Sequence, residues 1–131
     1  MQGKPVCEDV GMREIAAAMT AMGVALMMVA ATGCKKLPPP TPLDQLTAQQ
    51  THGYAVYQAH CASCHNDRTN DPLNGQSLRG IFKKQYLTSG APANDDRVMN
   101  AIIVGRPMMP ALGGDMTPQE REDLLAYMHT L

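Results

Sequence analysis

The stretch Cys61-Ala62-Ser63-Cys64-His65 carries the strongest chemical signal in this chain of 131 residues. Its two cysteines stand three positions apart, a spacing found in disulfides, redox dithiols and halves of zinc sites. A histidine follows the second cysteine at once. If a helical turn runs through the motif, residues 61, 64 and 65 lie at i, i+3 and i+4 and project to one side. The stretch therefore predicts three attachment points for one flat group.

Haem is the cofactor that this pattern fits. Each thiol can add across a vinyl group to form a thioether, and His65 can bind the iron; Cys-x-x-Cys-His is the attachment signature of c-type haem. A thioredoxin-like dithiol needs a preceding strand in a βαβ pattern, which the sequence lacks. Zinc needs four ligands, and no second pair occurs at ligand spacing. A plain disulfide leaves His65 without a role. We predict one haem c, bound through Cys61 and Cys64.

The first 33 residues are predicted to be an export segment. Residues 15–32 carry no charge, and Arg13 supplies the positive flank of a secretory signal. Two acidic residues, Glu8 and Asp9, fit this layout badly, and a true start at Met12 would remove them. The run ends in Ala31-Thr32-Gly33-Cys34, which resembles the lipobox of bacterial lipoproteins, where the cysteine is acylated. Cys34 is thus the candidate lipidation site.

Two other interpretations of this segment remain open. Eighteen apolar residues at roughly 1.5 Å each just span a thin hydrocarbon core, so residues 15–32 also fit an uncleaved membrane anchor. Ordinary cleavage by signal peptidase is the other alternative to lipidation. A lipid anchor or an N-terminal helix would both leave the remaining chain exported, on the periplasmic side and membrane-anchored.

Composition changes after the export segment. Residues 34–46 hold the candidate lipidated cysteine and a proline-rich stretch, KKLPPPTPLDQ, which predicts an extended tether. Residues 47–131 remain as one domain. A net charge of -1 without a basic stripe argues against a nucleic-acid partner. One Phe, four Tyr and no Trp leave the core short of large side chains, a deficit that a haem would fill.

Three helices are predicted in the domain. Thr47 and Gln50 form a capping box for a helix to about residue 60, and Thr117 followed by proline starts another over residues 118–129. The third spans residues 95–104, between Asn94 as cap and Gly105 as stop. One helical turn is expected at residues 83–87, within loops and without strands. In the last helix, the stretch from Glu120 to Asp123 is expected to face solvent.

Residues 47–131 resemble a class I c-type cytochrome of the short bacterial kind. The resemblance implies an all-α fold, with three main helices and long loops around one covalently attached haem. In that family a glycine and an aromatic residue, eight and four positions before the first motif cysteine, pack against a leucine and an aromatic on the C-terminal helix. Gly53 and Tyr57, with Leu124 and Tyr127, hold these positions.

The resemblance also implies a second axial ligand from a methionine in a loop before the last helix. Met109 directly precedes Pro110 and fits that pattern, with Met108 as its nearest rival. Most methionines fill cores, so Met116 and Met99 are less favoured as ligands than Met108, and Met99 is expected to pack on the helix over residues 95–104. Ligation by two histidines is disfavoured, because two of the other three histidines precede the attachment motif closely and the third lies on the last helix.

A segment of the form Gly-Pro-x-Leu-x-Gly follows the haem motif in this family, and its proline carbonyl accepts a hydrogen bond from the axial histidine. Residues 75–80 match it, with Gln76 in place of the proline. The Gln76 carbonyl can still do this work, which orients the ring. Leu78 is then the predicted haem-wall residue. Arg79 fits either a haem propionate or solvent.

An iron with both axial positions filled has no place for a substrate, so the resemblance implies an electron carrier and no enzyme. Its partners would be a redox donor and acceptor, such as a dehydrogenase, an oxidase or another cytochrome. One alternative is a haem-based sensor or ligand-binding domain whose sixth ligand is labile or absent. Another is a cytochrome subunit of a larger oxidoreductase.

Overall fold

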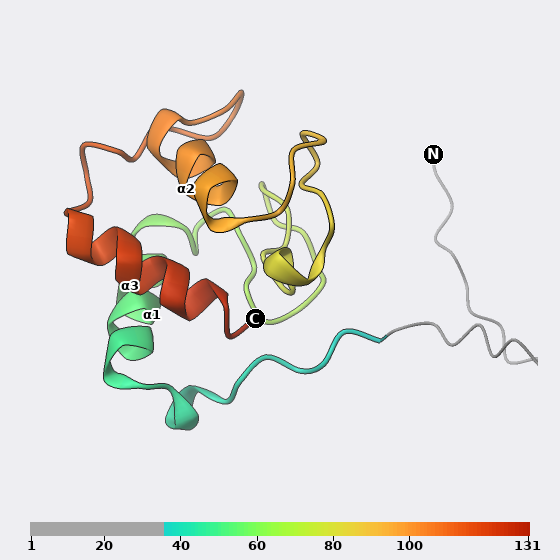
Figure 1. The fold of residues 1–131 in the computed structure, drawn as a ribbon, viewed down its shortest axis with the longest axis vertical. Coiled ribbons are helices and arrows are strands. Elements are labelled where there is room, and N and C mark those ends of the chain that lie inside the picture. Colours follow the sequence, from blue (N-terminus) through green and yellow to red (C-terminus); the bar gives the residue numbers. More distant parts are fainter. Residues whose placement is uncertain (1–35) are drawn as a thin grey trace, which may run out of the picture. The chain divides into compact units, whose positions relative to one another are not determined.

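The structure, a computed structural model, describes residues 36–131 and is all-α there, which confirms the predicted fold class (Figure 1). Its helices are α1 (Ala48–His60), α2 (Asp95–Val104) and α3 (Pro118–Met128), with short 3-10 turns η1 (Leu43–Gln45) and η2 (Ile81–Lys83). The described residues contain no strand, only two isolated β-bridges. The predicted export segment and Cys34 lie outside the described residues. No helix within residues 36–131 is long and apolar enough to cross a membrane.

All three helices begin where their capping residues predict. The Thr47 and Thr117 side chains each accept a hydrogen bond from the amide three residues on, and both capping boxes are complete. Asn94 caps α2 by accepting from the Arg97 amide at 3.0 Å. Gly105 ends α2 with φ 77°, a left-handed value that glycine adopts without strain. Local sequence thus determines the helix boundaries.

Helices α1 and α3 cross at Gly53. A Cβ placed on this glycine would lie 1.9 Å from the main-chain oxygen of Asp123 and 2.9 Å from Cβ of Tyr127. Only a residue without a side chain permits this approach. Next to the crossing, the rings of Tyr57 and Tyr127 lie 5.8 Å apart in a tilted pair. The helix contact predicted from the family resemblance is therefore present.

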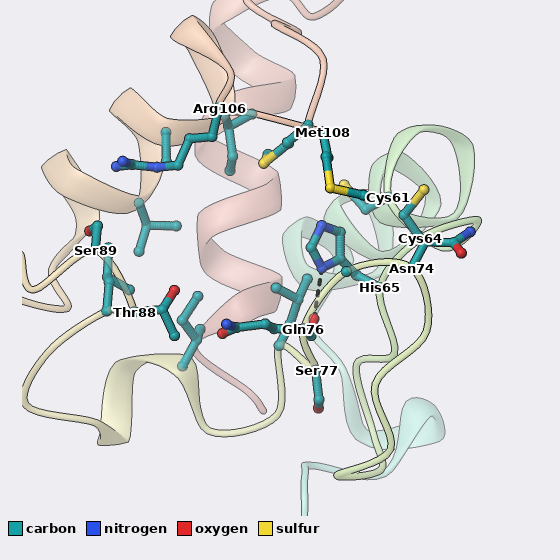
Figure 2. A pocket seen from close by; sticks show the side chains of 18 of the residues that line it. Cys61, Cys64, His65, Asn74, Gln76, Ser77, Thr88, Ser89, Arg106 and Met108 are labelled. Atoms are coloured by element: carbon teal, nitrogen blue, oxygen red, sulfur yellow. Dashed lines mark hydrogen bonds between the residues drawn. The ribbon is translucent and has the colours of Figure 1, made fainter. Parts of the chain in front are cut away.

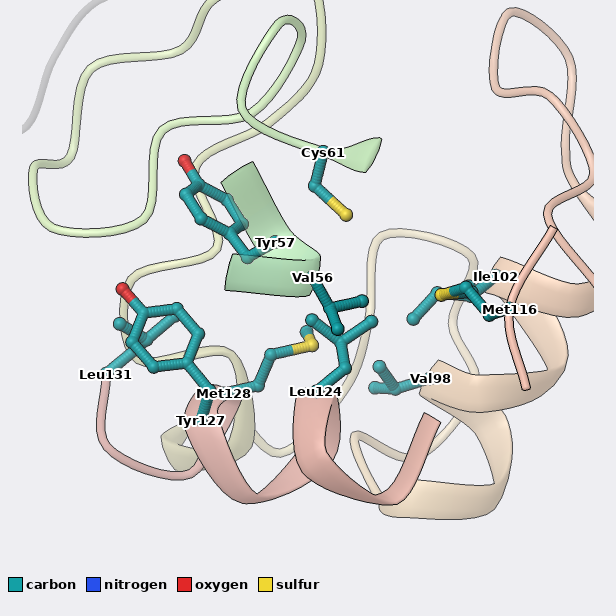
Figure 3. Packing of buried hydrophobic residues seen from close by; sticks show 10 residues of the cluster. All are labelled: Val56, Tyr57, Cys61, Val98, Ile102, Met116, Leu124, Tyr127, Met128 and Leu131. Carbon is teal, nitrogen blue, oxygen red and sulfur yellow. The ribbon is translucent and has the colours of Figure 1, made fainter. Parts of the chain in front are cut away.

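Ten buried side chains from the three helices and their flanks form the core (Figure 3). Tyr127 and Leu124 are fully buried, and Met116 and Met128 add flexible side chains to the same cluster. The core lies on one side of α1, whose last turn leads into the cysteine motif. Packing of the helices thereby fixes where the motif begins.

Two local predictions differ from the structure. The helical turn expected at residues 83–87 is η2 at Ile81–Lys83, because left-handed Gly80 ends the preceding loop and starts the turn earlier. Asp123, expected in solvent, is 3% exposed. Its carboxylate bonds the His52 ring at 2.7 Å and the Gln119 amide at 2.9 Å, which pairs a buried charge across α1 and α3.

The Asp123 contacts predict acid sensitivity. The hydrogen bond from His52, followed by that from Gln119, lowers the pKa of the Asp123 carboxyl. A carboxyl with a depressed folded-state pKa adds stability above its unfolded pKa, about 3.9, and this stability is lost as pH falls through the folded value. The free energy of unfolding should therefore fall below about pH 4, and less steeply in Asp123→Asn. Urea unfolding at several pH values measures this. Asp115→Asn, at an exposed carboxylate, should behave as wild type.

Candidate haem site

The cysteine motif continues the helical path of α1 for one more turn. The amide of Cys61 donates to Tyr57 O at 2.8 Å, and the amides of Cys64 and His65 donate to Cys61 O at 3.0 and 2.9 Å. All three motif side chains line the same cavity, as the spacing predicts (Figure 2). Both thiols are free of disulfides. The three attachment points therefore converge on one space.

This cavity has a volume of about 460 Å³, within the range of cofactor and ligand sites. Its walls are mainly apolar and come from the cysteine motif, the loops on both sides of η2, the segment from α2 to the methionine loop, and α3. The predicted site residues in it are Cys61, Cys64, His65, Leu78 and Met109. A cavity of this size, with two free thiols, an imidazole and a thioether on its walls, fits a covalently attached haem.

The His65 ring is held in one orientation from behind. Its Nδ1 lies 2.7 Å from the main-chain oxygen of Gln76 (Figure 2). A carbonyl only accepts, so Nδ1 carries the proton and Nε2 keeps its lone pair for a metal. Gly75 packs flat on the ring, since a Cβ there would lie 2.3 Å from His65 Cε1. Gln76 thus provides the carbonyl that the family takes from proline.

A tyrosine fixes the His65 backbone as well. The Tyr57 hydroxyl donates to His65 O at 2.5 Å. Burial, together with nearby Asp67, raises the pKa of Tyr57 far above its ordinary value, so the hydroxyl stays a neutral donor. Tyr127 in turn donates to Asp67. The aromatic residues at the α1–α3 crossing therefore also position the motif.

Met109 and Met108 occupy a tight turn at the cavity rim. Arg106 and Met109 exchange two main-chain hydrogen bonds, of 3.0 and 2.8 Å, which close the turn. Met108 sits inside it with φ 71° and is 98% exposed. Met109 is half-buried and packs against the core. Of the two sulfur-bearing side chains, only that of Met109 is held by packing.

The other methionines and histidines considered as ligands lie partly outside the cavity. Met116 and Met99 pack in or against the core and do not line the cavity, as predicted. His52 bonds Asp123, and His129 bonds Asp95. His60 does line the cavity.

Sequence reasoning missed part of the cavity wall. The loop after η2 lines it with Lys84, Tyr86, Thr88 and Ser89, and α3 contributes Met128. Arg106 lines it from the methionine loop (Figure 2). The loop residues follow no periodic pattern, so only its hydroxyl-rich composition hints at a polar wall. These groups could receive the haem carboxylates.

The surroundings of the motif thiols can be described further. Within residues 36–131, no cluster of three or more His, Cys, Asp or Glu side chains could hold a metal ion. Burial raises the pKa of the Cys61 thiol to about 11. A thiol with so high a pKa is protonated at neutral pH, so Cys61 is not itself a reactive thiolate.

The role of the Gln76 carbonyl predicts the effect of replacing Gln76 with proline, the residue that the family has at this position. Gln76→Pro keeps the carbonyl, and the Gln76 amide makes no main-chain bond that proline would remove. The visible spectrum and midpoint potential of the haem-loaded protein should therefore stay close to wild type. Gly75→Ala, which pushes a methyl group into the His65 ring, is the matched contrast and should change both. A large shift in Gln76→Pro would mean that the Gln76 carbonyl alone does not account for the orientation of His65.

Comparisons with known proteins agree with this geometry. Residues 48–128 match the family model described as cytochrome C oxidase, cbb3-type, subunit III. The chain is 28% identical to a cytochrome c6 of Thermosynechococcus vestitus over 83 residues, 63% of this chain and 70% of that protein. It is 31% identical to a cytochrome c6 of Nostoc over 63% of this chain and 71% of the relative. A cytochrome c-553-like protein of Synechocystis is 31% identical, covering 66% and 72%.

Proposed function

Since the chain belongs to the c-type cytochrome family described as cytochrome C oxidase, cbb3-type, subunit III, we propose that it is a membrane-tethered periplasmic carrier with iron between His65 and Met109. The family establishes the coarser statement: the protein is a class I mono-haem c-type cytochrome that carries electrons between redox partners. Covalently bound haem c is its cofactor, and it is not an enzyme. The proposed membrane tether, the periplasmic location and the two iron ligands rest on individual residues.

The bound haem supplies a metal centre that changes its charge by one electron. The protein supplies the surroundings. Cys61 and Cys64 hold the cofactor, and Gln76 keeps the His65 ring in the tautomer that binds iron. Met109 offers a soft thioether, which favours the reduced metal and a high potential. Leu78 and the neighbouring apolar side chains provide a wall for the flat face of the cofactor.

The observation that carries the proposal is the presence of His65 and Met109 on the walls of one cavity, each held by other parts of the fold. His65 is fixed by a 2.7 Å hydrogen bond and Met109 by a closed turn. With His65 and Met109 both bound to the iron, no position would remain for a substrate. This arrangement favours transfer of electrons over bond chemistry.

The tether is supported by sequence alone. Cys34 follows an uncharged run with a lipobox-like end, and a lipid on Cys34 or retention of residues 15–32 would anchor the domain outside the cytoplasm. The family description names an oxidase subunit. A role as subunit of a larger oxidoreductase would keep the same haem chemistry and change only the partner.

A redox titration followed by visible spectroscopy tests the proposed carrier. Protein matured in a host that attaches haem c should titrate reversibly as a single one-electron step, with a positive potential typical of Met/His ligation. Electron exchange with redox partners should depend only weakly on salt, because residues 35–131 carry balanced charges. A low potential, or steady turnover of peroxide, would contradict the proposal.

A further inference from the structure

Residues 37–46, here named the strap, lie on the folded domain although their sequence predicts a tether (Figure 1). At one end, Leu37 packs on Gly80: a Cβ placed on this glycine would lie 3.0 Å from both Leu37 methyl carbons. The Arg79 guanidinium donates to Leu37 O at 3.5 Å. The strap is thus docked from its first residue.

Three further contacts hold the strap, two of them at Thr41. The Thr41 amide donates to Thr130 O at 2.9 Å, which ties the strap to the end of the chain's last helical segment. Arg68, from the loop after the haem motif, donates to Thr41 O at 2.6 Å. At the far end Leu46 packs against the core. Ten residues are therefore part of the domain surface.

We propose that the strap seats the domain directly on a lipid surface; this rests on the proposed anchoring at Cys34. Three residue steps separate Cys34 from Leu37, and at about 3.3–3.6 Å each they reach about 10 Å. An undocked segment up to Thr47, thirteen steps from Cys34, would reach about 45 Å on the same scale. The short reach keeps the edge around Leu37 at the headgroups.

The side chains at this edge suit anionic headgroups. Lys36 and Lys83 are exposed, and the half-buried Arg79 donates to Leu37 O, the residue after Lys36. Lys83 Nζ donates to Leu131 O at 2.8 Å, so this lysine sits next to Gly80, whose amide bonds the same oxygen. None of the three forms a salt bridge with Asp or Glu in residues 36–131. Basic residues close to an anchor attract anionic lipids.

Seating on the lipid leaves the haem cavity accessible. No strap residue lines the cavity, whose walls begin at His60 in sequence. A redox partner could therefore approach the cavity rim while the strap edge stays on the membrane. The strap would therefore determine both the orientation of the domain on the membrane and its distance from the headgroups.

The experiment measures energy transfer from a headgroup-linked dye to the haem. The anchored full chain is placed on phosphatidylcholine vesicles containing phosphatidylglycerol, and binding is checked by flotation. One variant inserts about twelve Gly and Ser residues between Lys35 and Lys36, which lengthens the connection and leaves the strap intact. A second, Leu37→Ser with Thr41→Pro, releases the strap by removing its packing and one amide donor. Cys34→Ser is the chain without an acylation site.

We expect the dye to be quenched most by wild type and at least about twofold less by both the lengthened and the released chain. Unchanged visible spectra would show that each variant keeps its haem site. If the wild-type, lengthened and released chains all float and quench the dye equally, the seating by the strap is overturned, while the anchor stays in place. Failure of every chain to float would overturn the anchor and the seating together. In that case exchange of the Thr41 amide, protected only when the strap is docked, would still report on the strap.

Discussion

Met109→Ala is expected to remove the sixth ligand of the iron without unfolding the domain. The side chain is half-buried at the cavity rim, and its turn is closed by main-chain bonds that alanine can keep. The absorption band from iron–thioether charge transfer should disappear. The midpoint potential should fall by a few tenths of a volt, within the roughly 0.8 V range that axial ligands control. Visible spectroscopy and redox titration measure both effects.

Met108→Ala is the matched control, one position away in the same turn. Its side chain also lines the cavity but is 98% exposed, so no packing holds its sulfur in place. The spectrum of this variant should equal that of wild type. Loss of the band in Met108→Ala and its retention in Met109→Ala would reverse the assignment of the axial ligand.

Gly53→Ala is expected to be the most damaging small substitution in the fold. In an ordinary helix position alanine stabilises relative to glycine by about 1 kcal/mol. Here the new methyl group would lie 1.9 Å from a main-chain oxygen of α3, so the two helices must separate. Overpacking of this kind costs on the order of 3 kcal/mol, a large part of a typical folding free energy. Urea unfolding of the haem-loaded protein measures it.

Thr51→Ala provides the comparison on the same helix. Thr51 is exposed, and alanine there should leave the free energy of unfolding unchanged or slightly higher. If Gly53→Ala were as stable as Thr51→Ala, the close approach of α1 and α3 would not be a feature of the folded protein.

The sequence predicts the helices and the attachment motif well because their causes are local. Thr47, Asn94 and Thr117 bond amides three residues on, so a short window of sequence contains the whole interaction. The spacing of Cys61, Cys64 and His65 likewise fixes their common side within one turn. Such features need no knowledge of distant packing.

The features that sequence reasoning missed depend on distant partners. Asp123 belongs to a run of charges, and only the approach of α1 brings His52 to within 2.7 Å of it. The proline-rich strap looks like a free spacer until Arg68 and Thr130 are placed next to Thr41. The polar cavity wall after η2 comes from a loop without periodicity, whose position follows from the tertiary fold.

The most direct test of the central claim, an iron closed on both sides by His65 and Met109, is the reaction of the reduced wild-type protein with carbon monoxide. A filled sixth position has no vacancy for this ligand, so the visible spectrum should not change on mixing, whereas Met109→Ala should bind it at once. An immediate spectral change in wild type would contradict the closed site and favour a ligand-binding haem sensor.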